Sequence, residues 1–223
     1  MAKEKSFEAW MSIERTVADG IFHVGAIKFG AFRLKLHEKK PKAPLSPIYV
    51  TLRTPANGGP LSLGNVEMIG QILYDLVQRN KVLFDVVAGI PRAGEPFAAV
   101  ISRLSERPLL RLGKKVEEGS RKIDSVVGGE YQSGQLVLLV DDLITQADTK
   151  KEAIAVCEEA GLVVAGLVVL VDREQGGSEE LRKAGYSLYV VFPLSVLLDY
   201  YVQANLLTRE KRDEVMEYIV ANS

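Results

Sequence analysis

The residues best placed to do chemistry are two adjacent carboxylates at the end of an apolar run. The segment 137–151 reads VLLVDDLITQADTKK, which sets Asp141 and Asp142 directly after aliphatic residues. Carboxylates accept hydrogen bonds from sugar hydroxyls, and binding of this kind needs no proton transfer. Just beyond, Thr149 and Glu152 have the T-x-x-E spacing of a capping box and predict a helix N-terminus, where free amides bind phosphate. These residues favour a ligand that carries both sugar hydroxyls and a phosphate.

The turn before that helix lacks the glycine that a phosphate loop usually uses. Gln146, Ala147 and Asp148 stand where glycine would let backbone amides approach the phosphate. Ala147 fits there if its φ is negative, and Asp148 avoids repelling a phosphate if its carboxylate points outward. A purely structural interpretation stays open, in which the two acids end a strand and Asp148 or Thr149 caps the helix.

The elements that must position these residues alternate between strands and helices. Strands that are apolar throughout are buried on both faces, and their alternation with helices is typical of a parallel sheet. Ligands of such sheets bind beyond the carboxyl ends of the strands. The predicted strands are 84–90, 108–112, 136–140, 163–171 and 186–192, and a polar loop is predicted over 113–129. The predicted helices between and after them are 65–79, 94–104, 149–160, 178–184, 195–204 and 208–221.

The N-terminal part does not continue this alternation of strands and helices. Residues 6–19 predict an amphipathic helix with Ser6 as its N-cap and Gly20 as its stop. Short β-like pieces over 21–53 predict a small extended subdomain, interrupted by the basic segment HEKKPKAPL at 37–45. We therefore expect an N-terminal helix and small subdomain over 1–60, an α/β core over 61–193 and C-terminal helices over 194–223.

Composition excludes several classes of protein. The chain has 223 residues and a formal net charge of −1, which argues against a nucleic-acid-binding surface over the whole molecule. It contains two histidines and one cysteine, too few for a zinc site or a Ser-His-Asp hydrolase to be well supplied. No segment has the ~20 apolar residues of a membrane span. A cytoplasmic protein without nucleic-acid or membrane partners is the expectation.

Four segments, in order along the chain, resemble one family. They read GAIKFGAFRLK with SPIYVTLR, FDVVAGIPRAGEPFA, VLLVDDLITQADT and VLVDREQGG. The third resembles the phosphoribosyl-pyrophosphate motif of type I phosphoribosyltransferases, and the others are similar to segments of orotate phosphoribosyltransferase. The resemblance implies an α/β fold, with an open, mainly parallel sheet flanked by helices and a small N-terminal hood. It also implies transfer of the 5-phosphoribosyl group to orotate, giving orotidine 5′-monophosphate and pyrophosphate in pyrimidine biosynthesis.

The resemblance also implies a cofactor, an assembly and a set of site residues. Mg²⁺ would bridge pyrophosphate and ribose oxygens, and a homodimer would share its active sites through a mobile loop. Asp141 and Asp142 would hold the ribose hydroxyls and meet Mg²⁺ indirectly, through ribose or water. The other implied positions are Arg111, Lys114 and Lys115 for pyrophosphate; Thr145, Gln146, Ala147, Asp148 and Thr149 for the 5′-phosphate; and Lys35, Tyr49 and Arg173 for orotate. Arg111, Lys114, Lys115 and Asp142 form the predicted catalytic set.

The chain departs from the family pattern at the two loops. In the mobile loop, Leu112 stands at a usual lysine position and Glu117 at the usual histidine position. The phosphate turn lacks glycine, and the insertion 37–45 follows Lys35 where the orotate pocket is built. Two alternatives therefore stay open: a non-catalytic homologue that binds a nucleotide or the donor for regulation, and a transferase for another base. Arg173 has a simpler interpretation too, as an ion-pair partner of Asp172 or Glu174.

Overall fold

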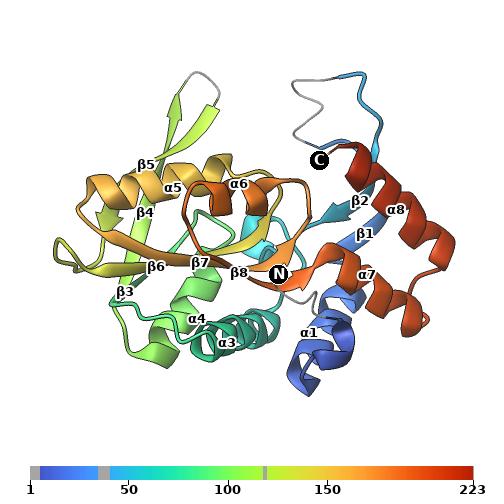
Figure 1. The fold of residues 1–223 in the computed structure, drawn as a ribbon, viewed down its shortest axis with the longest axis horizontal. Helices are drawn as coiled ribbons and strands as arrows, with labels where there is room; N and C mark the ends of the chain where they lie inside the picture. Colours follow the sequence, from blue (N-terminus) through green and yellow to red (C-terminus); the bar gives the residue numbers. More distant parts are fainter. Residues whose placement is uncertain (1–5, 35–40, 118–119, 223) are drawn as a thin grey trace.

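A central sheet covered by helices on both faces forms the body of the protein (Figure 1). The computed structural model describes residues 6–34, 41–117 and 120–222. In these ranges the sheet has six strands in the order β5-β4-β3-β6-β7-β8, all parallel except β5, which pairs antiparallel with β4. The predicted α/β architecture with a mainly parallel sheet is confirmed.

The strands and helices have the following bounds. The strands are β1 (Ile27–Phe32), β2 (Ser46–Val50), β3 (Val86–Gly89), β4 (Leu109–Glu117), β5 (Ser120–Gly128), β6 (Leu136–Ile144), β7 (Val163–Asp172) and β8 (Leu188–Pro193). The helices are η1 (Phe7–Ala9), α1 (Ser12–His23), η2 (Pro55–Asn57), α3 (Leu63–Arg79), α4 (Glu95–Ser105), α5 (Asp148–Glu159), α6 (Gly177–Lys183), α7 (Leu194–Gln203) and α8 (Arg209–Ala221).

Alternating residues of the central strands pack into two separate hydrophobic clusters, one on each face of the sheet. On β6, Val137 and Leu139 belong to a buried cluster with α5 and α6, while Leu138 and Val140 belong to a second cluster with α3 and α4. This is the two-sided burial that an unbroken aliphatic run predicts. The same alternation places Asp141 on the α5 side of the sheet.

The N- and C-terminal parts of the chain pack together at one end of the sheet (Figure 1). Strands β1 and β2 form a separate antiparallel hairpin, and α8 packs on β2. Tyr201 of α7 is fully buried and donates a hydrogen bond to the Ala18 carbonyl of α1 at 2.8 Å. None of the helices in the described ranges has both the length and the apolar character of a membrane-spanning helix.

Two predictions about local structure are wrong. The N-terminal helix begins at Ser12 and runs through Gly20 to His23, because the Glu14 carboxylate accepts a hydrogen bond from the Met11 amide at 2.8 Å and closes the first turn there. The predicted polar loop 113–129 is largely a β-hairpin, because β4 continues to Glu117 and pairs with β5. Figure 1 shows this hairpin projecting past α5.

The turn between β3 and α4 presses against β6 at the first carboxylate. The amide of Ile90 donates to the Val140 carbonyl at 2.8 Å. A Cβ on Gly94 would lie 2.1 Å from that carbonyl oxygen and 2.9 Å from the Asp141 Cα. Glycine is therefore required at position 94 for close approach of two backbones.

Replacing Gly94 should destabilise the protein measurably. We expect Gly94→Ala to lower the free energy of unfolding by about 1–3 kcal/mol, because the added methyl group overpacks a rigid backbone contact. Gly64→Ala is the matched control, since its Cβ would meet nothing closer than the Ser62 hydroxyl at 3.7 Å. Urea denaturation measures both. Equal stability of the two variants would contradict the prediction.

Candidate active site

The two carboxylates lie inside a strand and not at its end. β6 continues through them to Ile144 and pairs with β7, with Asp141 opposite Val169 and Ile144 opposite Asp172. The prediction that the strand stops before Asp141 is therefore wrong, because β7 offers backbone partners for the extra residues. Asp141 and Asp142 are 5% and 9% exposed. At this depth a carboxylate needs a partner to remain charged.

Asp141 has that partner in a buried lysine. The Lys150 ammonium lies 2.7 Å from Asp141 Oδ2 and also donates to the Leu143 carbonyl at 2.6 Å. Asp141 Oδ1 accepts from the Asp142 amide at 2.9 Å. Lys150 is not among the site residues predicted from the sequence. Its burial could have been predicted from its spacing, because position 150 shares one helical face with Ala153, Ile154 and Cys157, which are all buried.

The pKa of Asp142 is raised. Burial, together with the charge of Asp141, raises the pKa of Asp142 to about 8, and Lys150 offsets only part of this effect. The carboxyl group is thus protonated near neutral pH in the absence of a ligand. A cation brought to the site would favour its ionised form.

The phosphate turn enters α5 without strain. Ala147 is the N-cap, with φ −86° and ψ −6°, so the residue in the glycine position adopts the negative φ that alanine tolerates. Asp148 is exposed. The predicted capping box is wrong: Thr149 lies within the helix, and Glu152 accepts a hydrogen bond from the Ile123 amide of β5 instead, at 3.2 Å.

The end of β7 is joined to this turn by its backbone. The Arg173 amide donates to the Ile144 carbonyl at 2.9 Å, and the Gly177 amide donates to the Thr145 carbonyl at 3.1 Å. A Cβ on Gly177 would lie 2.8 Å from the Thr145 carbonyl oxygen. The DREQGG segment and the phosphate turn therefore form one continuous rim.

Arg173 is buried in this rim with part of its guanidinium unpaired. It is 5% exposed, and burial lowers its pKa from the ordinary arginine value. In the described part of the chain, Nε and Nη2 have no hydrogen-bond partner. These two nitrogens form the side-on edge with which arginine grips a carboxylate in bidentate fashion. The arrangement suits a planar anionic ligand.

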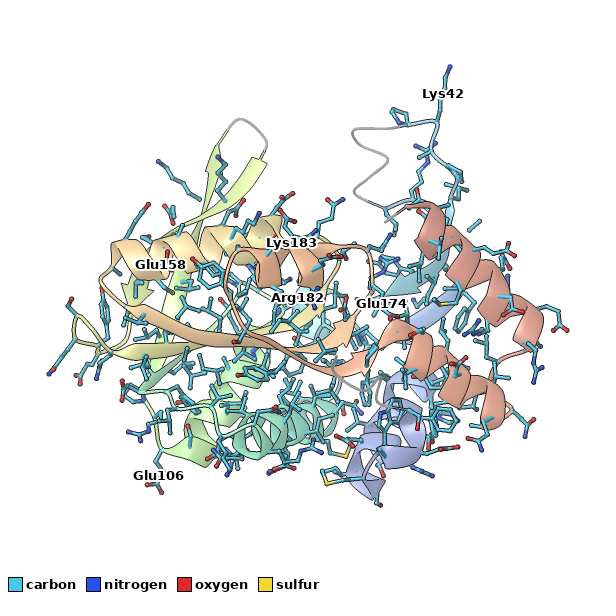
Figure 2. All side chains as sticks on the ribbon, viewed as in Figure 1. Lys42, Glu106, Glu158, Glu174, Arg182 and Lys183 are labelled. Carbon is cyan, nitrogen blue, oxygen red and sulfur yellow. The ribbon has the colours of Figure 1, made fainter. Side chains whose placement is uncertain are left out.

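The acids beside Arg173 are engaged elsewhere. Asp172 accepts hydrogen bonds from the Glu174 amide and the Ser178 hydroxyl. Glu174, labelled in Figure 2, accepts from the amide and the hydroxyl of Ser195 at 2.6 and 2.9 Å, at the start of α7. No ion pair from Arg173 to either acid is found among the described residues.

The predicted pyrophosphate cations lie on the β4–β5 hairpin. The Lys114 ammonium donates to the Pro91 carbonyl at 2.9 Å, so it reaches the β3–α4 turn that touches β6 at Asp141. Arg111 and Lys115 are exposed, and they pair through the backbone with Gly128 and Lys122. Through the Pro91 carbonyl, Lys114 is linked to the turn that lies beside Asp141.

The predicted orotate side is described only in part. Lys35 and residues 37–40 of the insertion lie outside the described residues. Tyr49 lies on β2, 38% exposed, with its ring 5.6 Å from that of Phe32. Its role in binding stays a prediction.

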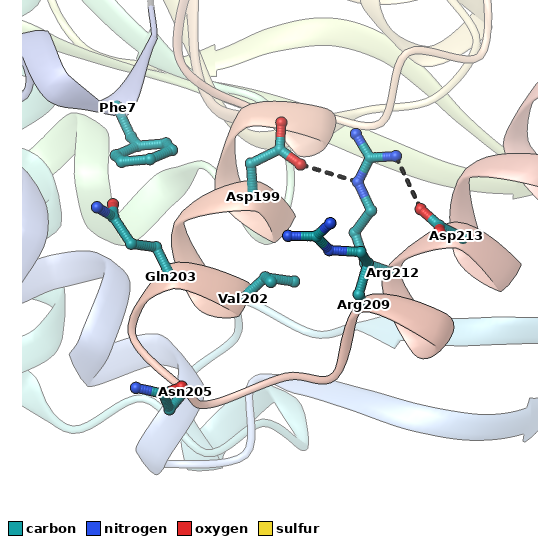
Figure 3. Close-up of a pocket in the computed structure, with 8 residues that line it drawn as sticks. All are labelled: Phe7, Asp199, Val202, Gln203, Asn205, Arg209, Arg212 and Asp213. Atoms are coloured by element: carbon teal, nitrogen blue, oxygen red, sulfur yellow. Dashed lines mark hydrogen bonds and ion pairs between the residues drawn. The ribbon is translucent and has the colours of Figure 1, made fainter.

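A pocket of about 620 Å³ lies between η1, α7 and α8 (Figure 3). Within it, Arg212 forms ion pairs with Asp199 at 2.8 Å and with Asp213 at 3.1 Å. None of the predicted site residues lines it. We therefore place the candidate site at the rim of β6 and β7 and not here.

The raised pKa of Asp142 predicts how stability changes with pH. Its pKa in the folded state, about 8, exceeds the ordinary value of 3.8. Between these two pH values the folded state therefore carries a proton on Asp142 that the unfolded state lacks. The free energy of unfolding should fall as pH rises through this window, by up to about 1.4 kcal/mol per pH unit. Asp142→Asn should remove this slope and Asp148→Asn should keep it, in urea denaturation from pH 5 to 8. Identical slopes in wild type and Asp142→Asn would refute the assignment.

Comparison with known proteins relates the chain to phosphoribosyltransferases. Residues 64–192 match the family model of the phosphoribosyl transferase domain. The chain is 31% identical over 182 residues to the orotate phosphoribosyltransferase of Sulfurisphaera tokodaii, covering 80% of this chain and 87% of that protein. It is 29% identical over 210 residues to bovine uridine 5′-monophosphate synthase, covering 93% of this chain and 41% of that protein.

The same relationship holds in three dimensions. The structure of Leishmania donovani UMP synthase superposes with a TM-score of 0.76 at 30% identity, covering 96% of this chain and 43% of that one. The chain thus spans about two fifths of these synthases and most of the archaeal enzyme. It belongs to the phosphoribosyltransferases and, among them, to the orotate phosphoribosyltransferase family.

Proposed function

We propose that this chain transfers the 5-phosphoribosyl group from phosphoribosyl pyrophosphate to a ring nitrogen of orotate, giving orotidine 5′-monophosphate and pyrophosphate in pyrimidine biosynthesis. The observation that carries the proposal is Arg173. Its backbone is hydrogen-bonded to the end of β6, and its Nε and Nη2 are buried without a hydrogen-bond partner among the described residues. Orotate is a planar carboxylate, and a guanidinium edge binds such a group with two parallel hydrogen bonds.

The donor would bind along the end of β6. Asp142 and Asp141 would hold its ribose hydroxyls, and residues 145–149 would surround the 5′-phosphate at the N-terminus of α5. Lys114, which reaches the β3–α4 turn, would neutralise the leaving pyrophosphate together with Arg111 and Lys115. Since the bond to pyrophosphate breaks as the sugar gains positive charge, positioning and charge neutralisation would supply most of the rate.

Phosphoribosyltransferases generally use Mg²⁺ with this donor. Two adjacent carboxylates suit Mg²⁺, which proteins usually hold through one or two carboxylates while phosphate oxygens and waters complete its shell. Asp141 and Asp142 would meet the ion indirectly, through ribose or water. When bound, the ion would supply charge neutralisation of the pyrophosphate.

A homodimer with shared active sites is part of the proposal. The β4–β5 hairpin projects past α5 (Figure 1), and Lys115 on it is exposed. A hairpin that projects in this way can carry a cation to a neighbouring subunit's site. The cytoplasm is the proposed location, supported by the free and buried thiol of Cys157.

Turnover tests the proposed function directly. Purified protein with orotate, phosphoribosyl pyrophosphate and Mg²⁺ should show Mg²⁺-dependent loss of orotate absorbance, because the product absorbs differently. The double variant Asp141→Asn/Asp142→Asn is the blank and should show none. Loss that persists in the blank, or no loss in the wild type, would count against the proposal.

Arg173 should determine the affinity for orotate. We expect Arg173→Met to raise the KM for orotate at least about tenfold, because two charge-assisted hydrogen bonds are lost. The KM for the donor should change much less. The matched control is Arg182→Met, whose side chain on α6 is 78% exposed (Figure 2). A larger effect on the donor KM than on the orotate KM would contradict the assignment.

A further inference from the structure

The C-terminal helix α8 carries a buried tyrosine whose hydroxyl is unpaired. Tyr218 is 8% exposed, and its hydroxyl oxygen has no hydrogen-bond partner among the described residues. The other buried residues of α8 are Val215 and Ile219, so an apolar side chain would suit this face of the helix. A buried hydroxyl without a hydrogen bond destabilises the folded state. Tyr218 therefore carries a polar atom that the packing of α8 does not require.

A second buried group with unpaired atoms lies near this phenol. Nε and Nη2 of Arg173 are buried without a partner in the same described ranges. Burial lowers the pKa of Arg173, and the nearby Tyr218 phenol partly offsets this effect. An influence of this kind acts between neighbouring groups. The two side chains are thus neighbours, and within the described part of the chain they do not hydrogen-bond to each other.

Contacts on either side of Tyr218 hold α8 in this place. Arg212, in the first turns of α8, forms an ion pair with Asp199 of α7 at 2.8 Å. The start of α7 is held in turn by Glu174, which accepts a hydrogen bond from the Ser195 amide at 2.6 Å. α8 also packs on β2 (Figure 1). The DREQGG segment, α7 and α8 are therefore connected beside the β1–β2 hairpin.

We infer that Tyr218 is a specificity-determining residue, whose hydroxyl donates a hydrogen bond to the same carboxylate of orotate that Arg173 binds. This inference rests on the proposed function and adds a residue of the C-terminal helix to the base site. A carboxylate has two oxygens with about four lone-pair sites, so it can accept two bonds from the guanidinium and one from the phenol. An uncharged base would gain less, because hydrogen bonds to an ionised acceptor are roughly twice as strong as neutral ones.

The alternative is a structural role, in which the Tyr218 hydroxyl stabilises the contact between α8 and the DREQGG segment. Removing the hydroxyl would then lower the melting temperature and leave orotate binding unchanged. If the hydroxyl binds the ligand, its removal weakens orotate binding and leaves the melting temperature unchanged. The two roles therefore predict opposite pairs of effects.

The test compares Tyr218→Phe with Tyr201→Phe, a matched control on α7. Tyr201 is also buried, but its hydroxyl has a protein partner, the Ala18 carbonyl at 2.8 Å. Steady-state kinetics gives the KM for orotate and for phosphoribosyl pyrophosphate, and thermal unfolding gives the melting temperature. Calorimetry with orotate, in the presence of pyrophosphate and Mg²⁺, measures orotate binding without turnover.

We expect Tyr218→Phe to raise the KM for orotate about tenfold, because a hydrogen bond to an ionised group is lost. The KM for the donor should change less than about twofold, and the melting temperature should stay within about 2 °C of the wild type, since no protein group loses a partner. Tyr201→Phe should lower the melting temperature by about 2–6 °C and leave the orotate KM unchanged. In an Arg173→Met background, Tyr218→Phe should have a smaller effect on orotate binding, because both residues bind one carboxylate.

An unchanged orotate KM in Tyr218→Phe would overturn the inference, and so would equal increases in both KM values. The proposed function can fail separately. If the wild type shows no turnover but binds orotate, and Tyr218→Phe weakens that binding, only the transfer reaction is refuted. Absence of orotate binding in the wild type would refute both.

Discussion

The candidate site depends on a buried ion pair at the carboxyl end of β6. Asp141 lies where the β3–α4 turn, β6 and the first turns of α5 meet, and an unpaired carboxylate there would carry a large desolvation cost. The Lys150 ammonium, 2.7 Å from Asp141 Oδ2, offsets this cost. It also donates a hydrogen bond to the Leu143 carbonyl and so connects α5 to β6. Because the phosphate turn connects these two elements, the pair fixes both ends of the turn.

The second constraint is the contact between the ends of β6 and β7. The backbone amides of Arg173 and Gly177 donate hydrogen bonds to the Ile144 and Thr145 carbonyls, so the DREQGG segment and the turn into α5 are held together. Glycine at 177 permits this, because a side chain would collide with the Thr145 carbonyl. The position of Arg173 is thereby coupled to that of the turn into α5.

The sequence predicted most of the fold and part of the site. A continuous apolar run such as that of β6 predicts a strand that is buried on both faces. The positions of the strands along the chain, and of the helices between them, could therefore be predicted from the sequence. The extent of β4 does not, because Gly113, Lys114 and Lys115 have no β-pattern and become strand only by pairing with β5. The capping box failed for a similar reason, since Glu152 finds its partner on β5 and not in its own helix.

Lys150 shows why chemistry was harder to predict than architecture. A lysine in a helix is usually solvated, and only its place in the stripe with Ala153 and Cys157 indicates burial. The partner, Asp141, is nine residues earlier in the chain and is identified by the fold, which places Asp141 on the α5 side of the sheet.

The turn between β6 and α5 needs no glycine. Ala147 is fully buried within the core under α5 and α6, so its methyl group contributes packing that glycine would lose. Its negative φ shows that the turn needs no left-handed residue. In glycine-rich loops the backbone amides approach a phosphate closely, whereas here the side chain of Ala147 packs in the core and the Lys150–Asp141 ion pair holds α5 against β6.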